Sequence, residues 1–285
     1  EFFLKSIIVF GATESAKEIY TEIAKDYKII YFCDNDSSKW GKKIDNIEII
    51  SPKEMIGCVY DYIAIVSLSS MDIIRKQLIE LGVQEQVIVT KYIEHKVKSR
   101  EIFLKNFAKL VNASHQKYAG CVAEAGVFQG EYAKCINKYF SNRKLFLFDT
   151  FEGFDKADVE LEKQNKFSNA TENHLSITSI EMVLGKMPFP ENVVIRKGYF
   201  PNTAIDIDEK FVFVNLDMDL YKPTLEGLKF FWPKMVKGGI ILIHDFFSTG
   251  YAGVNKAIEQ FVIENPDTEN RFFPIGDDVS IAIMK

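Results

Sequence analysis

Short apolar runs alternate with helix-length amphipathic segments along the whole chain. Strands that alternate with helices predict a mostly parallel sheet with helices on both faces. We therefore expect a small Rossmann-like α/β domain over residues 1–92, with a helix over 71–81 and a second helix that starts at Pro52. The strands predicted for this domain are 6–11, 29–33, 47–50, 62–66 and 87–89.

A second α/β domain is predicted over residues 118–285, after a helical linker over 93–117. The helix expected over 224–236 is predicted to end at the glycine pair 238–239. The last two strands form a terminal antiparallel hairpin, and this arrangement resembles the sheet of class I methyltransferases. The predicted strands are 121–123, 145–148, 193–196, 211–216, 240–243, 271–275 and 279–284.

The most informative local motif is Glu-Ala-Gly-Val-Phe-Gln-Gly at 124–130, between a short strand and a helix. Gly126 and Gly130 would let a ligand approach the backbone, and the helix start offers free N–H groups. Glu124 has the wrong sign for a phosphate but suits an ammonium or a hydroxyl, which favours S-adenosylmethionine (SAM) over a dinucleotide. Asp149 ends the next strand, where an acid commonly takes ribose hydroxyls, and Thr150 follows it. The alternatives are a glycine turn used for packing and an acid that caps a loop.

Acidic residues and a histidine follow two later strands, as Asp217, Asp219, His244 and Asp245. Ligands bind beyond the carboxyl ends of strands in an open α/β sheet, so these side chains should converge. Their repulsion would be relieved by a divalent cation, typically Mg²⁺, with Asp217, Asp219 and Asp245 as the predicted ligands. Such an ion could hold two substrate oxygens and acidify a hydroxyl. Alternatively, Asp219 caps the following helix and His244 only forms hydrogen bonds.

Three residues are candidates for the catalytic proton transfer or its support: Asp217, His244 and His174. His244 is open to three roles, as a metal ligand, as a base, or as neither. His174 lies in the long polar segment 155–190, which we interpret as a lid over the site, and it could be the general base. A solvated loop histidine is the alternative for His174.

Five ordered motifs in the second half resemble the macrocin O-methyltransferase family, which methylates sugar hydroxyls on natural products. The resemblance covers 118–285 and implies dependence on SAM and Mg²⁺, with metal acids at Asp217 and at the pair 244–245. Many members have Asp-Asp at that pair, whereas this chain has His-Asp. The motifs are Glu124–Gly130, Phe148–Phe154, Gly198–Thr203, Asp217–Thr224 and His244–Phe246.

The first ninety residues carry a different resemblance, to nucleotide-sugar-binding N-terminal domains of bacterial sugar acyltransferases and related enzymes. It rests on the stretches 33–41 and 49–54. In the turn 11–16, Glu14 would repel a pyrophosphate and the later glycines of a dinucleotide motif are replaced, so we expect no NAD binding. Asp34 at the end of the second strand is still a candidate to bind a ribose. A domain used for packing or substrate docking is the alternative.

The composition limits the classes of partner that we expect. The 285 residues carry a net charge of −5, so no nucleic-acid partner is predicted, and no apolar run is long enough to cross a membrane. Cys33, Cys58, Cys121 and Cys135 show no paired spacing. Cys33 and Cys121 lie in predicted strands and are interpreted as buried free thiols, which favours a cytoplasmic location. A small molecule is the expected partner, and a homo-oligomer stays open.

Together these patterns predict a SAM-dependent, Mg²⁺-dependent O-methyltransferase that acts on a sugar or sugar-nucleotide hydroxyl. A first alternative is an NAD-dependent sugar-nucleotide oxidoreductase, which the altered glycine turn at 11–16 disfavours. A second is a non-catalytic nucleotide-sugar binding protein. The acidic cluster beside intact cofactor motifs disfavours that one.

Overall fold

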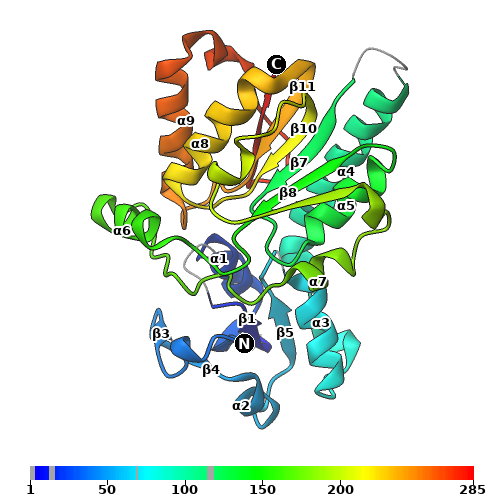
Figure 1. The fold of residues 1–285 in the computed structure, drawn as a ribbon. Helices are drawn as coiled ribbons and strands as arrows, with labels where there is room; N and C mark the ends of the chain where they lie inside the picture. Colours follow the sequence, from blue (N-terminus) through cyan, green and yellow to red (C-terminus); the bar gives the residue numbers. More distant parts are fainter. Residues whose placement is uncertain (1–3, 13–16, 69, 114–118) are drawn as a thin grey trace. The chain divides into compact units, whose positions relative to one another are not determined.

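The chain divides between Lys98 and Ser99 into two α/β units, which are described one at a time (Figure 1). The computed structural model describes residues 4–12, 17–68, 70–113 and 119–285, so Glu14 and the rest of 13–16 lie outside it. The predicted linker is the helix α4 (Lys91–Ala113), which begins in the first unit and ends in the second. The structure therefore assigns part of that helix to each unit.

The first unit is a Rossmann-like sheet in the order β3-β4-β2-β1-β5-β6. All its strand pairs are parallel except β3 with β4. Helix α2 starts at Pro52 as predicted, because Ser51 and Glu54 form a capping box. The elements are β1 (Ser6–Phe10), α1 (Lys17–Asp26), β2 (Lys28–Cys33), β3 (Lys43–Ile44), β4 (Ile47–Ile50), α2 (Pro52–Ile56), β5 (Tyr62–Ile65), α3 (Met71–Glu80) and β6 (Ile88–Val89), with short 3-10 helices at Ser37–Lys39 and Glu85–Val87.

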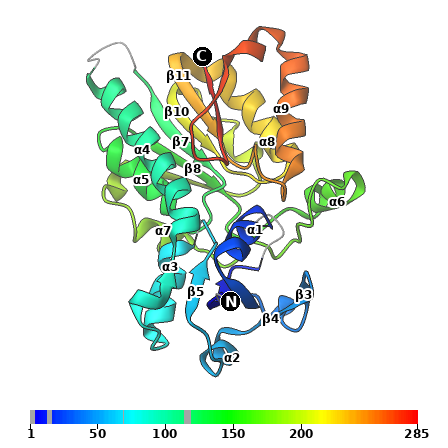
Figure 2. The same cartoon turned by 180° about the vertical axis from the view of Figure 1, so that it is seen from behind.

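The second unit contains a seven-stranded sheet in the order β12-β13-β11-β10-β7-β8-β9. Strand β13 is antiparallel to both of its neighbours, which confirms the predicted terminal hairpin (Figure 2). The elements after α4 are β7 (Cys121–Ala125), α5 (Glu131–Tyr139), β8 (Leu145–Asp149), α6 (Lys156–Asn165), α7 (Ile180–Leu184), β9 (Val193–Lys197), β10 (Phe211–Leu216), α8 (Tyr221–Phe231), β11 (Met235–Ile243), α9 (Ala252–Glu264), β12 (Phe272–Pro274) and β13 (Ile281–Met284), with 3-10 helices at Pro190–Asn192, Asn202–Ala204, Trp232–Lys234 and Pro266–Arg271.

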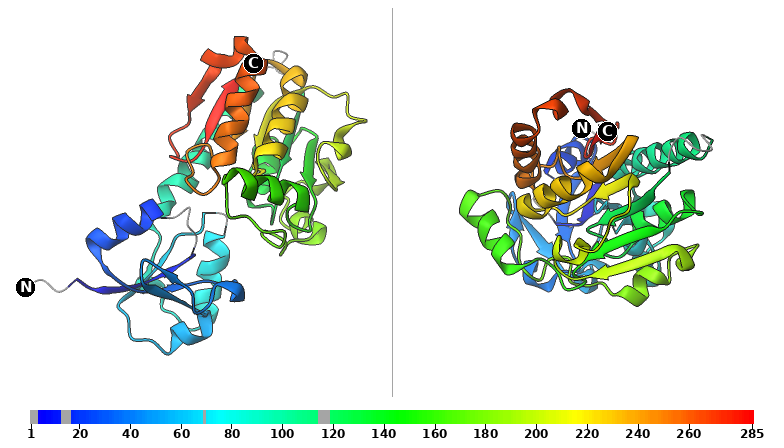
Figure 3. Two further views of the ribbon diagram at one scale, coloured as in Figure 1. Left: turned by 90° about the vertical axis from the view of Figure 1, so that its left-hand side faces the viewer. Right: turned by 45° about the horizontal axis from the view of Figure 1, so that its top comes forward.

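Helices cover both faces of the second sheet (Figure 3). One core holds apolar side chains of α4, α5 and α7, and the other holds those of α8 and α9. Side chains alternate along a strand, so Val122 of β7 enters the first core and Ala123 enters the second. By the same alternation Glu124 points to the face that α4 and α5 cover.

Strands β7 and β10 lie side by side although β8 and β9 come between them in the sequence. After β7 the chain adds β8 and β9 on one side of the sheet, and after β10 it adds β11, β12 and β13 on the other side. Such a switch point opens a crevice at the carboxyl ends of the two strands, where α/β proteins bind ligands. The turn that begins at Gly126 and the turn that begins at Asp217 both leave from this edge.

The predicted end of the helix after Thr224 is wrong. Helix α8 stops at Phe231, a 3-10 turn with Pro233 follows, and β11 begins at Met235. Proline disfavours continued α-helix at the residue before it. Gly239 therefore lies inside a strand, where a Cβ would meet the Val212 carbonyl oxygen at 3.0 Å. The glycine allows close strand packing and caps no helix.

The long polar segment 155–190 contains two helices, α6 and α7. Residues of α6 contact α8, and Ser168 forms a β-bridge with Tyr251. The segment therefore contacts the rest of the second unit through both α6 and Ser168.

The cysteines are free thiols, as expected. Cys33 is buried, and burial raises the pKa of its thiol to about 12. Cys121 is only partly buried, less than its place in a strand suggested. Among the residues that the structure describes, no helix combines the length and the apolar character needed to cross a membrane.

The packing of α4 on the sheet gives the first prediction. Leu104 is fully buried in the core between α4 and the sheet, so Leu104→Ala should lower the free energy of unfolding by about 2–5 kcal/mol. Ile102 on the same helix is 55% exposed, so Ile102→Ala should change it by less than about 0.5 kcal/mol. Denaturant unfolding followed by circular dichroism measures both. Equal losses would contradict the packing described.

Candidate active site

The glycines of the turn after β7 are required by the protein's own packing. Gly126 has φ +83°, and a Cβ there would lie 1.8 Å from the Asp217 carbonyl oxygen. The Asp217 N–H in turn donates to the Ala125 carbonyl at 2.8 Å, so the β7 and β10 turns touch. Gly130 has φ +79°, and a Cβ there would lie 3.0 Å from Cγ1 of Val183. The close approach predicted at Gly126 is therefore made by the neighbouring strand's backbone.

Asp149 holds this turn in shape. Its Oδ2 accepts from the N–H groups of Val127 at 2.7 Å and Phe128 at 2.8 Å, and its Oδ1 accepts from Phe151 N–H at 2.7 Å. A carboxylate offers about four lone-pair positions, so room for one more hydrogen bond remains on Oδ1. Thr150 stabilises the next turn by donating to the Gly153 carbonyl at 2.7 Å. Contact of Asp149 with a ribose stays a prediction.

A buried polar network runs from β7 to the end of β10. Asn215 Nδ2 donates to Glu124 Oε1 at 2.8 Å, and Arg100 Nη2 donates to both Asn215 Oδ1 and Asp217 Oδ2 at 2.9 Å. The Arg100 guanidinium stacks 4.0 Å from the centre of the Tyr132 ring. Sequence reasoning missed Arg100, Asn215 and Tyr132, because a lone arginine on a helix and a lone asparagine in a strand carry no motif.

Glu124 has the properties of a ligand-binding acid. It is 1% exposed, and burial together with nearby Asp217 raises the pKa of its carboxyl to about 8. Its Oε2 is buried and has no hydrogen-bond partner among the residues that the structure describes. An unsatisfied buried acceptor is costly, so Oε2 is the atom of this turn that still lacks a hydrogen-bond donor.

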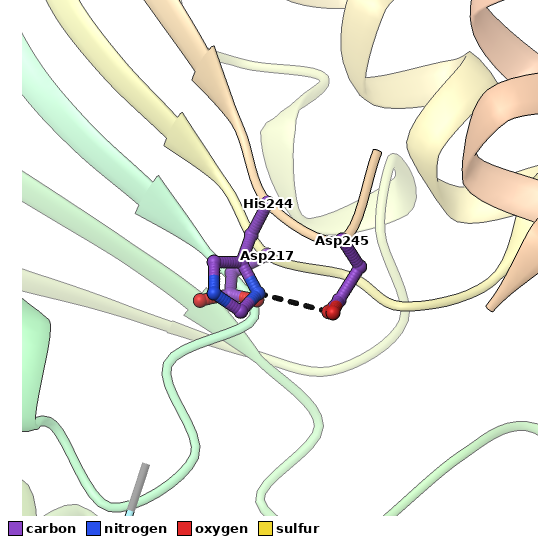
Figure 4. Close-up of side chains that lie close together, drawn as sticks. All are labelled: Asp217, His244 and Asp245. Atoms are coloured by element: carbon purple, nitrogen blue, oxygen red, sulfur yellow. Dashed lines mark hydrogen bonds and ion pairs between the residues drawn. The ribbon is translucent and has the colours of Figure 1, made fainter. Parts of the chain in front are cut away.

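Asp217, His244 and Asp245 converge at the ends of β10 and β11, as Figure 4 shows. His244 Nδ1 lies 3.0 Å from Asp217 Oδ1 and 2.9 Å from Asp245 Oδ2. Burial and Arg100 act to lower the pKa of His244, but Asp217 and Asp245 outweigh them and raise it to about 9. Burial acts to raise the pKa of Asp217, but His244 and Arg100 hold it well below its ordinary value. At neutral pH His244 is therefore protonated, and its charge offsets that of the neighbouring acids.

The same three residues could hold a metal ion. One ligand atom from each lies within 4.8 Å of the others, and this is the group of that kind among the described residues. Carboxylate oxygens suit a hard divalent cation, and the imidazole also suits transition metals. Asp219 is outside this group, although we predicted it as a ligand. Its carboxyl is buried beside Asp245, and burial followed by that charge raises its pKa well above the ordinary value.

His174 lies apart from that group. Its Nδ1 is 3.5 Å from the Tyr251 hydroxyl, and its ring packs edge-on against Phe154. Burial raises the pKa of Tyr251 well above its ordinary value, and the charges of Asp219 and Asp245 add to this. Tyr251 therefore lies near the acids and also contacts His174. No motif along the chain indicated Tyr251.

Buried acids of α6 connect the segment 155–190 to its surroundings. Glu162 accepts from the Tyr221 N–H at 2.8 Å and from the Ser168 hydroxyl at 2.7 Å. Asp158 accepts from the Tyr199 hydroxyl at 3.1 Å. Hydrogen bonds between backbone or hydroxyl groups and buried carboxylates are among the stronger ones, so α6 is held at the start of α8.

The strand order and the turn after β7 define a class I methyltransferase. Residues 95–270 match the family described as macrocin-O-methyltransferase (TylF), and residues 3–89 match the one described as C2185-like, N-terminal. The chain belongs to the macrocin O-methyltransferase family and is a SAM-dependent O-methyltransferase. No curated protein matches it.

Two solved structures show the same fold. The O-methyltransferase NovP aligns with a TM-score of 0.52 and 18% identity, over 66% of this chain and 79% of its own. The calicheamicin methyltransferase CalS11 aligns with a TM-score of 0.53 and 19% identity, over 68% of this chain and 81% of its own. The predicted fold class is confirmed, with its antiparallel strand β13.

The contact between Gly126 and Asp217 gives the second prediction. Gly126→Ala should abolish measurable SAM binding and lower the melting temperature, because its Cβ would push the Asp217 backbone away. Gly276 has φ +84° with nothing within 4 Å of a Cβ, so Gly276→Ala reports the strain alone, about 1–2 kcal/mol. Calorimetric SAM titration and thermal melts compare the two. Unchanged SAM affinity in Gly126→Ala would contradict the role given to this contact.

Proposed function

We propose that this enzyme methylates a hydroxyl of a sugar or sugar nucleotide, with a divalent cation, Mg²⁺ by expectation, beside the acceptor. The observation that carries the proposal is the convergence of Asp217, His244 and Asp245 at the edge that also carries Glu124. The cofactor side and the acidic side of the site are then adjacent. A pair of neighbouring sugar hydroxyls would occupy two of the three positions that an octahedral Mg²⁺ ion held by three protein ligands leaves open.

On the cofactor side, Glu124 Oε2 is the acceptor for the ammonium or a hydroxyl of SAM, and Asp149 Oδ1 has capacity for a ribose hydroxyl. Gly126, Gly130 and Thr150 shape the turn around it. SAM supplies a methyl group on a positively charged sulfur. Catalysis then depends mainly on how the chain aligns the acceptor oxygen with that methyl group.

On the acceptor side, Asp217, Asp245 and His244 would hold the ion, and Asp219 lies behind Asp245. The ion would polarise the acceptor hydroxyl and lower its pKa. Without an ion, and above its raised pKa, His244 would be the better placed of the two histidines considered as a base, because it lies with Asp217 at the strand ends. His174 contacts Tyr251 and stays the second candidate.

For the first unit we propose a docking role for nucleotide sugars, without NAD. Asp34 at the end of β2 accepts from the Ala12 N–H at 2.9 Å and from Lys39 Nζ at 2.9 Å. Like Asp149, Asp34 therefore holds its own loop, and the argument against the oxidoreductase alternative rests on the altered glycine turn at 11–16. We further propose a cytoplasmic protein with no nucleic-acid partner, as the composition suggests; homo-oligomerisation remains open.

The proposed reaction is tested with SAM labelled in its methyl group and a panel of free sugars, nucleotide sugars and glycosylated natural products. We expect label in a nucleotide sugar or sugar, at a hydroxyl with a neighbouring hydroxyl. NAD is included with each compound. Label transfer only to an acceptor without a sugar would contradict the proposal, and reduction of NAD would support the alternative.

Chelation gives the third prediction. EDTA should stop methyl transfer and Mg²⁺ should restore it, because Asp217, His244 and Asp245 then need a cation to orient the acceptor. Asp245→Asn should slow turnover by about 100-fold, equivalent to about 3 kcal/mol. Asp206, whose exposed carboxylate pairs with Arg196 at 3.1 Å, provides the control Asp206→Asn, which should behave as wild type. Turnover that is unaffected by EDTA would exclude a metal and leave a histidine as base.

A further inference from the structure

Arg100 is a largely buried cation of the second unit, and its contacts connect both sides of the site. Its Nη2 donates to Asp217 Oδ2 and to Asn215 Oδ1, each at 2.9 Å, and Asn215 passes the contact on to Glu124 at 2.8 Å. We propose that Arg100 is a positioning residue that orients the acceptor-side acid Asp217 and the cofactor-side acid Glu124 together. The role of Asp217 in this inference rests on the proposed function; the role of Glu124 needs only SAM binding.

The sheet register places these groups next to one another. Asn215 of β10 is the direct register partner of Glu124 of β7, and both strands run parallel. Their side chains share the face that α4 and α5 cover, where Arg100 of α4 and Tyr132 of α5 lie. Asp217 follows β10 immediately, so one guanidinium reaches the strand and the turn at once.

Arginine has the shape that this position needs. The guanidinium lies over the Tyr132 ring, with its Cζ 4.0 Å from the ring centre, and its Nη2 donates to both acceptors. A lysine ammonium is a strongly hydrated point charge without the planar surface that lies over the ring, although its single nitrogen also carries enough N–H groups for two acceptors. Without the cation, two buried carboxylates would lie close together with little to offset them.

Arg143 of the same unit supplies a matched control. It also lies close to an aromatic ring, that of Phe140 at 6.0 Å, and its Nη1 donates to the Gly120 carbonyl at 2.7 Å. Gly120 precedes β7, so Arg143 acts at the amino end of the strand, opposite the site. It contacts none of the acids discussed above among the hydrogen bonds of the described chain.

The test compares Arg100→Met, Arg100→Lys and Arg143→Met in the full chain. SAM affinity is measured by calorimetry, Mn²⁺ affinity by its paramagnetic resonance signal, and methyl transfer at saturating SAM and acceptor. We expect Arg100→Met to weaken SAM binding about tenfold, to change Mn²⁺ affinity, and to slow transfer about 100-fold, because a misplaced group near the reacting atoms has effects of that size. Arg100→Lys should recover stability more than rate. Arg143→Met should lower only the melting temperature.

A fourth variant, Asn215→Ser, separates the two arms of Arg100. The shorter serine side chain should lose the bridge between Arg100 and Glu124, whereas Arg100 keeps its contact with Asp217. SAM affinity should therefore fall while Mn²⁺ affinity stays near that of the wild type. If Arg100→Met and Arg143→Met lose melting temperature alike and keep both affinities and the rate, Arg100 is only structural and the inference is wrong. If the wild type binds SAM but not Mn²⁺, the proposed metal fails, and the SAM arm still decides the role of Arg100.

Discussion

The site depends on the contact between the ends of two adjacent parallel strands. Gly126 leaves β7 where Asp217 leaves β10, and no side chain fits between them, because a Cβ on Gly126 would overlap the Asp217 carbonyl. The turn that faces the cofactor and the turn that carries the acids are therefore one packed unit. This contact exists because the sheet order reverses between these strands, which also creates the crevice for a ligand.

Packing several acids at this edge requires cations of the chain itself. Arg100 contacts one carboxylate oxygen of Asp217, and His244 contacts the other. His244 also contacts the carboxylate of Asp245. Because each carboxylate is buried or nearly so, its repulsion would otherwise destabilise the fold. The helix α4 and the end of β11 thus supply charges that let β10 end in an acid. A bound cation would join this balance, and the protein's own cations allow the site to exist before it binds.

Much of this could be read from the sequence, and the failures have physical causes. Periodicity placed the strands of both units except the two-residue β3, and it placed the antiparallel β13; the strand ends identified Asp217, His244 and Asp245 as neighbours. It failed where glycine has two uses, since Gly239 serves strand packing in β11 and caps no helix. Arg100 and Asn215 come into contact only in the folded chain, because 115 positions separate them in the sequence. A pattern along the chain has no way to show such a pair.

The number of hydrogen bonds that an acid at a strand end already accepts helps to distinguish a structural role from a ligand-binding role, which the residue type alone does not. Asp149 and Glu124 were both expected to face the cofactor, yet Asp149 already accepts three backbone N–H groups and Glu124 accepts one side-chain donor through Oε1. A carboxylate that already accepts three backbone N–H groups shapes its own loop, whereas a buried oxygen without a partner among the described residues still lacks a donor. By that criterion we propose Glu124 as the primary cofactor acid and Asp149 as the residue that shapes the turn, with one lone pair left for a ribose hydroxyl.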